Sequence, residues 1–168
     1  TFRMGGMYLN YAEALYEYFK ACGNGNAADA SGAVEYTDAE GNAQSVTVPA
    51  SQTAAKMASK TRERSSMPAF AVGMTNDEFW AEYKNERRVE LAFEGHRFYD
   101  VRRWMEDGDK FMIIHRMEIT KNEDGTFSYK KVAYKRGDGQ WQSKWNLFPF
   151  NQTEIMKSGG AITQNPGW

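Results

Sequence analysis

Cysteine is almost absent from this chain of 168 residues, in which Cys22 is the only one. A single cysteine excludes an internal disulfide, and its position in a predicted helix suggests a small buried side chain. The sequence also lacks an apolar run of the ~20 residues that a membrane-spanning helix needs. The formal net charge is only −1, so no basic excess points to nucleic acid as a partner.

Motifs that hold metals or carry out catalysis are scarce too. Neither of the two histidines lies in an HExxH or Glu-x-x-His pattern, the usual spacing of a helical zinc site. His96 and Asp100 are placed to face one metal from a helix, but His115 is distant in the sequence. There is also no GxSxG motif, phosphate-binding loop or supported Cys/His pair. We therefore predict no metal site, no cofactor and no catalytic residue of these kinds.

The composition fits one globular domain, because 41% of the residues are hydrophobic and 14% are aromatic, which is unlike a disordered chain. Helical periodicity predicts helices over residues 2–22 and 51–65, with Ser51 as an N-cap. A capping box at Thr75–Glu78 opens another helix. Alternating residues around glycine turns predict hairpins at 34–48 and 112–136. The predicted fold class is mainly α with two small β-hairpins.

The first predicted helix has a broad aromatic side. Its apolar residues follow i, i+3, i+4 spacing, and they are Met4, Met7, Tyr8, Tyr11, Leu15, Tyr18 and Cys22. Such a stripe is typical of helix–helix packing, so we expect it to pack on further helices or to remain as an exposed apolar patch. Gly5 and Gly6 weaken the first turn by roughly 1 kcal/mol each relative to alanine.

Many charges occur between Asn85 and Trp104, within an otherwise apolar helical pattern. At 100° per residue, large apolar side chains and five charged ones fall on the same side. The charged residues are Glu86, Arg87, Glu90, Glu94 and Arg97. Buried charges are costly unless they pair, and arginine matches the geometry of a carboxylate. We predict a mostly buried ion network in which these five residues pair with one another and fix how the helix docks.

The three glutamates also allow an alternative interpretation. Paired carboxylates can hydrolyse glycosidic bonds, so a glycoside hydrolase that uses Glu86, Glu90 and Glu94 stays open. However, carboxylates beside arginines are held ionised, which does not suit a general acid. Burial of the glutamates would favour the structural network, whereas a cleft exposing two of them would favour the enzyme.

The charged stretch resembles the signature of the SusD/RagB family, the surface nutrient-binding lipoproteins of outer-membrane glycan uptake systems. Members carry a run like ERRRELAFEGHRWFDLRRW, and from Glu86 this chain reads ERRVELAFEGHRFYDVRRW. Val89 stands where an arginine or lysine is common. Four other segments are similar to family segments, namely Arg3–Ala14, Thr61–Pro68, Asn146–Ile155 and Ile162–Trp168.

The resemblance implies a tetratricopeptide-like helical fold, of which residues 1–168 would form the C-terminal segment. Residues 23–50 exceed the connection that is usual in the family, so we interpret them as a surface insertion. Family chains are considerably longer than this one. The N-terminal part of the same protein, including a lipidated cysteine, would therefore be missing from this segment.

The function that the resemblance implies is non-enzymatic. The protein would capture a nutrient, an oligosaccharide above all, and deliver it to a SusC-like TonB-dependent outer-membrane transporter. It would lie at the cell surface, lipid-anchored to the outer membrane through an N-terminal cysteine outside this segment. A tetratricopeptide-type protein-interaction module is the other alternative to the hydrolase.

Three aromatic residues are candidates for ligand binding. Sugars have apolar C–H faces and polar edges, so their sites need exposed aromatic rings flanked by hydrogen-bonding groups. Tyr36 lies in the predicted insertion, and Trp141 and Trp145 follow a glycine-rich turn. For each of the three, packing against neighbouring side chains is the alternative role.

Overall fold

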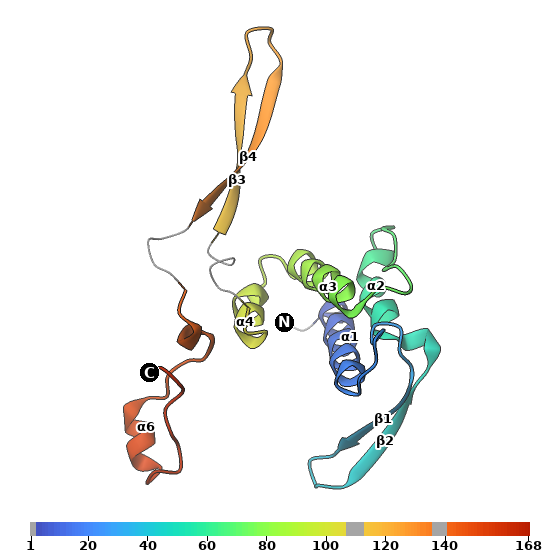
Figure 1. Ribbon diagram of the computed structural model, residues 1–168, viewed down its shortest axis with the longest axis vertical. Helices are drawn as coiled ribbons and strands as arrows, with labels where there is room; N and C mark the ends of the chain where they lie inside the picture. The colour runs from blue at the N-terminus through green and yellow to red at the C-terminus, as the bar shows by residue number, and fades with distance from the viewer. Residues whose placement is uncertain (1–2, 107–112, 136–140) are drawn as a thin grey trace. The chain divides into compact units, whose positions relative to one another are not determined.

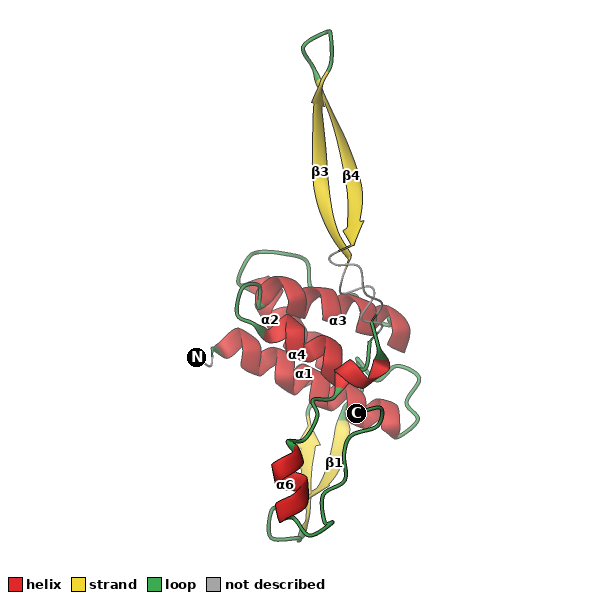
Figure 2. Cartoon of the chain, turned by 90° about the vertical axis from the view of Figure 1, so that its left-hand side faces the viewer, coloured by secondary structure: helices red, strands yellow, loops and turns green. Residues whose placement is uncertain are grey.

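The computed structural model describes residues 3–106, 113–135 and 141–168 (Figure 1). The chain divides into two compact units, Thr1–Glu94 and Gly95–Trp168. The first unit contains α1 (Met4–Ala21), β1 (Gly32–Thr37), β2 (Ala43–Val48), α2 (Ala54–Glu63) and α3 (Asn76–Glu90). The second contains α4 (His96–Arg103), β3 (Ile113–Lys121), β4 (Phe127–Lys135) and α6 (Gln152–Lys157). The predicted combination of helices with two small antiparallel hairpins is confirmed (Figure 2).

Helix α1 forms where the periodicity predicts it, but it buries a different side. Leu9, Ala12 and Tyr16 have no exposed surface, whereas Met4 is 62% and Met7 is 51% exposed. The buried side faces α2 and α3 of the same unit. Because α1 has apolar residues on most of its circumference, its sequence alone did not indicate which side the core would take.

An aromatic cluster between α1 and α3 forms the core of the first unit. The ring of Tyr16 stacks on that of Trp80, with centroids 5.2 Å apart, and Trp80 stacks on Tyr83 at 5.3 Å. Phe79 contacts Tyr16 at 5.0 Å and Phe70 at 5.6 Å. Tyr16, Phe79 and Tyr83 are among the largest fully buried side chains of the protein, so these rings contribute a large share of the packing between α1 and α3.

The pattern of the charged stretch predicted one continuous helix, but the structure contains two helices there. Helix α3 ends at Glu90, and α4 begins at His96 after a turn. Phe93 and Gly95 in this turn have positive φ values of 66° and 79°, which no α-helix contains. Phe93 is fully exposed, at 108%, although the helical pattern placed it on the apolar side.

The helix caps follow the sequence in part. The capping box of α3 is present, because the Glu78 N–H donates to Thr75 Oγ1 and the Thr75 N–H donates to Glu78 Oε2. Asn151 likewise accepts from the Thr153 N–H at the start of α6. The cap predicted at Ser51 is wrong, since this residue lies in a short 3₁₀ turn (Ala50–Gln52) and α2 follows Thr53.

Within the described residues, both hairpins have the predicted strands and turns, and the predicted outer ends of the second hairpin, Met112 and Arg136, lie outside these residues. In β1–β2, Val34 pairs with Val46 and Tyr36 with Gln44. In β3–β4, Ile119 pairs with Tyr129, and the Asn122 N–H donates to the Thr126 carbonyl across the turn. Cys22, predicted to be buried, is exposed, because it follows the last residue of α1 on the side away from the core.

Candidate functional site

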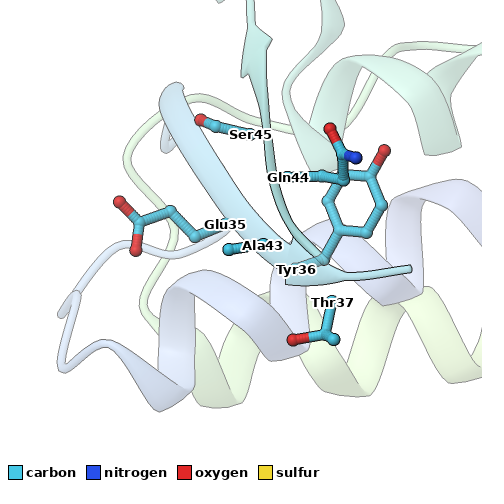
Figure 3. Close-up of a pocket in the computed structure, with 6 residues that line it drawn as sticks. All are labelled: Glu35, Tyr36, Thr37, Ala43, Gln44 and Ser45. Carbon is cyan, nitrogen blue, oxygen red and sulfur yellow. The ribbon is translucent and has the colours of Figure 1, made fainter. Parts of the chain in front are cut away.

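A shallow, open pocket lies on the β1–β2 hairpin next to its turn. It is lined by Glu35, Tyr36, Thr37, Ala43, Gln44 and Ser45 (Figure 3). All six lining residues are exposed to solvent. All six residues come from one pair of neighbouring strands, and the register makes Tyr36 and Gln44 direct neighbours on one face.

Tyr36 and Gln44 lie on one face of the hairpin, and Glu35, Thr37, Ala43 and Ser45 lie on the other. They are direct cross-strand partners, and Figure 3 shows the Gln44 amide beside the Tyr36 ring. Tyr36 is 52% exposed, so much of its ring is accessible to a ligand. The Gln44 amide nitrogen donates to Asp38 Oδ2 at 3.0 Å. This bond fixes the amide next to the ring and leaves its oxygen as an acceptor.

Asp38 organises the turn that carries the pocket. Its Oδ1 accepts from the Asn42 N–H at 2.7 Å and from the Glu40 N–H at 3.1 Å. These bonds hold the pKa of the Asp38 carboxyl below its usual value, with the Gln44 bond the largest cause and the Asn42 N–H next. Sequence reasoning missed both Asp38 and Gln44. The available signal was an aspartate that could cap its own turn.

The base of the hairpin is fixed to the helices of the first unit. The Glu35 N–H donates to Tyr18 Oη at 3.0 Å, and Val48 is buried. In the preceding loop, Ala27 and Ala28 are buried. The surface part of the interval 23–50 is therefore narrower than expected, because its beginning and end contribute to the core. That the interval is an insertion stays a prediction.

The Tyr36–Gln44 pair combines the two features that sugar recognition requires. The Tyr36 ring offers an apolar platform for a C–H face, and the Gln44 amide offers hydrogen bonds at its edge. The Asp38 carboxylate accepts from the Gln44 amide and also from the N–H groups of the turn. The arrangement is therefore suited to binding and contains no pair of groups placed for proton transfer.

Trp141 and Trp145 lie in the second unit and contact each other. Their rings meet edge to face, with centroids 5.6 Å apart. Both residues are half-buried. Their mutual contact supports the packing role over a ligand platform of the open kind that Tyr36 offers.

Arg102 lies at the centre of the same cluster, which the sequence did not indicate. Its guanidinium carbon is 3.6 Å from the centroid of the Phe98 ring, 5.0 Å from that of Trp141 and 5.6 Å from that of Phe148. Burial lowers the pKa of Arg102. The cation therefore contributes packing to the second unit through aromatic faces.

Glu86 is one of the buried members of the predicted ion network. It is 8% exposed. Thr61 Oγ1 donates to its Oε1 at 2.7 Å, and Arg62 Nε donates to its Oε2 at 2.9 Å. The Arg62 guanidinium also lies 3.8 Å from the centroid of the Phe70 ring. Glu86 therefore fixes α3 to α2 from within the core.

Glu90, the last residue of α3, joins all three helices of the first unit. Arg3, at the N-cap of α1, contacts it at 2.5 Å, and Arg64, after the end of α2, contacts it at 2.9 Å. Arg3 also donates to the Glu90 carbonyl. These partners lie far away in the sequence, so the helical pattern around Glu90 could not reveal them.

The other three residues of the predicted ion network differ from Glu86 and Glu90 in their burial and in their partners. Arg87 is buried and donates to Asn10 Oδ1 at 2.8 Å, and Glu94 contacts Arg3 at 2.6 Å. The side chains of Glu94 and Arg97 are 32% and 36% exposed, and Arg97 lies 3.7 Å from Glu106. The expectation that all five are mostly buried is therefore wrong for these two. The prediction that the five pair with one another is wrong for Glu86 and Glu90, because their arginine partners are Arg62, Arg3 and Arg64 in place of Arg87 and Arg97.

Gly5 has a specific role at this junction. A Cβ atom at Gly5 would lie only 2.6 Å from Glu90 Oε1, closer than non-bonded atoms approach. Gly6, by contrast, would place its Cβ 3.8 Å from Leu91 Cδ2, an ordinary contact. The glycine that seemed to weaken the start of the helix thus provides the space that Glu90 occupies.

Neither a metal centre nor a hydrolase site emerges from the described residues. Among them, no group of three or more His, Cys, Asp and Glu side chains is arranged to hold a metal ion. Glu86 and Glu90 each contact arginine side chains and connect helices of the first unit. Within the same part of the chain, no helix is long and apolar enough to cross a membrane.

Comparison with known proteins identifies the family. The family model described as the SusD family matches residues 1–168, the whole chain. No curated protein and no solved structure matches in the corresponding searches. The family match agrees with the helices, the hairpins and the charged stretch after Asn85, and the chain belongs to the SusD family.

Proposed function

We propose that this protein captures an oligosaccharide nutrient at the cell surface and passes it unchanged to a SusC-like TonB-dependent outer-membrane transporter. Members of the SusD family are generally non-catalytic, nutrient-binding proteins associated with the outer membrane. Membership in this family therefore indicates a nutrient-binding role. The proposal goes further in naming the ligand class and the transporter.

The Tyr36–Gln44 pair is the observation that carries the ligand class. It presents an accessible ring beside an amide that Asp38 holds in place. Such a site gains affinity from stacking and a few neutral hydrogen bonds. We expect dissociation constants in the micromolar range, roughly −8 kcal/mol, which is weak enough for the ligand to be released to a transporter.

The arginine-bridged glutamates support binding without chemistry. Glu86 and Glu90 connect helices, so we assign them a structural role in place of glycoside hydrolysis. We also propose that this chain is the C-terminal segment of a longer tetratricopeptide-like protein that is lipid-anchored through an N-terminal cysteine.

Glycan binding by the full-length protein tests the proposal. A glycan array identifies the ligand, and calorimetry then compares wild-type protein with Tyr36→Ala and Gln44→Ala. We expect each substitution to weaken binding about tenfold, the equivalent of about 1.4 kcal/mol. Tyr134→Ala is a matched control, because Tyr134 lies on the other hairpin and is 54% exposed against 52% for Tyr36.

Two results would contradict the proposal. Equal affinity of the Tyr36→Ala variant and wild-type protein would show that the Tyr36–Gln44 pair does not contact the ligand. Release of sugar products, abolished by Glu90→Gln, would instead establish the hydrolase.

A further inference from the structure

We propose that one face of the β3–β4 hairpin is a docking surface for a protein partner whose own surface combines carboxylates with an apolar strip. The identity of that partner rests on the proposed function, in which it is the TonB-dependent transporter. The surface itself is assigned from the register, exposure and charge of the two strands.

The register sorts the side chains of the hairpin by residue number. Cross-strand partners share a face, and successive residues alternate between faces. Since Met117 pairs with Lys131 and Ile119 with Tyr129, the odd-numbered residues of both strands form one face, called the odd face here. The even-numbered residues form the even face.

The odd face is apolar and accessible over its length. Ile113 is 39% exposed, Met117 57%, Ile119 60%, Phe127 53% and Tyr129 66%. A two-stranded ribbon that buries neither face is only marginally stable in water, and a contiguous apolar patch is typical of an interaction site. The exposure of these apolar side chains and the marginal stability of an uncovered ribbon both favour a partner that covers the odd face.

The charges on the two faces differ in kind. The odd face carries Lys121 and Lys131, and no Asp or Glu occupies an odd position in either strand. On the even face, Arg116 pairs with Glu118 at 2.8 Å, and Glu118 lies opposite Lys130. The uncompensated cations are thus on the apolar side, where a partner with carboxylates would complement them.

Two other occupants fit less well. A second copy packed through the same face would place lysines against lysines, because such a contact is symmetric. An anionic lipid surface would meet Glu123 and Asp124 in the turn at the end of the ribbon. A protein surface can place its carboxylates beside the lysines and away from this turn.

Neutralisation of the cations on each face tests the charge component. The full-length protein is titrated onto the purified transporter at low and high salt. We expect Lys121→Gln/Lys131→Gln to weaken binding about tenfold and to reduce its salt dependence. Arg116→Gln/Lys130→Gln removes the same charge from the even face and should change affinity by less than about twofold.

A second matched pair tests the apolar component. Ile119 and Tyr129 are cross-strand partners on the odd face, and Ile114 and Tyr134 are partners on the even face. We expect Ile119→Thr/Tyr129→Thr to weaken binding at least about tenfold, and Ile114→Thr/Tyr134→Thr to have little effect. Threonine suits a strand, and thermal melting verifies that each variant folds as wild-type protein does.

Each remaining outcome decides against the inference in a distinguishable way. If wild-type protein binds the transporter and the odd-face variants bind equally well, the odd face is not the interface and the proposed function stands. If wild-type protein does not bind the transporter, both proposals fail. Lysine-dependent binding to phosphatidylglycerol vesicles, or a dimer that the odd-face variants dissociate in sedimentation, would assign the face to lipid or to a second copy.

Discussion

The two units of this protein differ in what they bury. The first unit encloses an aromatic cluster together with charged residues such as Glu86 and Arg87. In the described part of the second unit, only Asp100 and Val101 are buried. The first unit is therefore stabilised by its own interior, whereas the second depends on local turns, caps and ring contacts and presents apolar side chains outward. Sensitivity to substitution should follow the same division.

The largest difference is expected between two arginines. Arg62→Ala strands the buried Glu86 carboxylate and removes the contact with Phe70, which should cost about 3–5 kcal/mol of unfolding free energy. Arg97→Ala removes a half-exposed side chain 3.7 Å from Glu106 and should cost less than about 1 kcal/mol. Chemical denaturation monitored by circular dichroism measures both. Equal losses would abolish the contrast between the units.

Alkaline pH should act on the first unit through its buried tyrosines. Burial raises the pKa of Tyr16 to about 12, and burial, followed by the neighbouring Glu13, also raises that of Tyr83. Stability from these groups is therefore complete below pH 10, the ordinary tyrosine pKa, and is lost as pH rises from there toward the folded value.

Denaturation at a series of alkaline pH values measures this effect. Tyr16→Phe should flatten the decline, although it also removes the hydrogen bond to the Asn76 carbonyl. Tyr129→Phe, on the exposed hairpin, serves as a control and should leave the decline unchanged. A decline that is equally steep in the Tyr16→Phe variant would contradict the assignment.

The smallest effects should come from two adjacent glycines that respond with opposite sign. Gly6→Ala makes an ordinary contact and should stabilise α1 by about 0.5–1 kcal/mol. Gly5→Ala should destabilise the first unit by about 1 kcal/mol, because the new methyl group displaces Glu90 from Arg3. Thermal melting of the two variants distinguishes them. Stabilisation by both would show that Glu90 moves aside freely.

Local chemistry made much of the fold predictable. The capping box at Thr75 indicated the start of α3, and the glycine turns indicated both hairpins. These features depend on residues a few positions apart, which the sequence displays directly. The Tyr36 position in a strand next to a turn was equally readable, whereas its Gln44 neighbour followed only from the register.

Contacts between distant residues were not predictable in the same way. The arginines that meet Glu90 come from the beginning of α1 and the end of α2, and helical periodicity around Glu90 contains no information on them. The buried side of α1 was missed because apolar residues occur on both sides of it. The break at Phe93 was missed because the charged pattern continues across it.

The junction at Glu90 also bears on the order of folding. Arg3 and Glu90 are separated by 87 residues, so their contact closes a loop that spans nearly the whole first unit. A contact between residues so far apart in the sequence carries an entropic cost of loop closure that nearer contacts do not carry. We therefore expect the contact that secures the first turn of α1 to form late in the folding of the first unit.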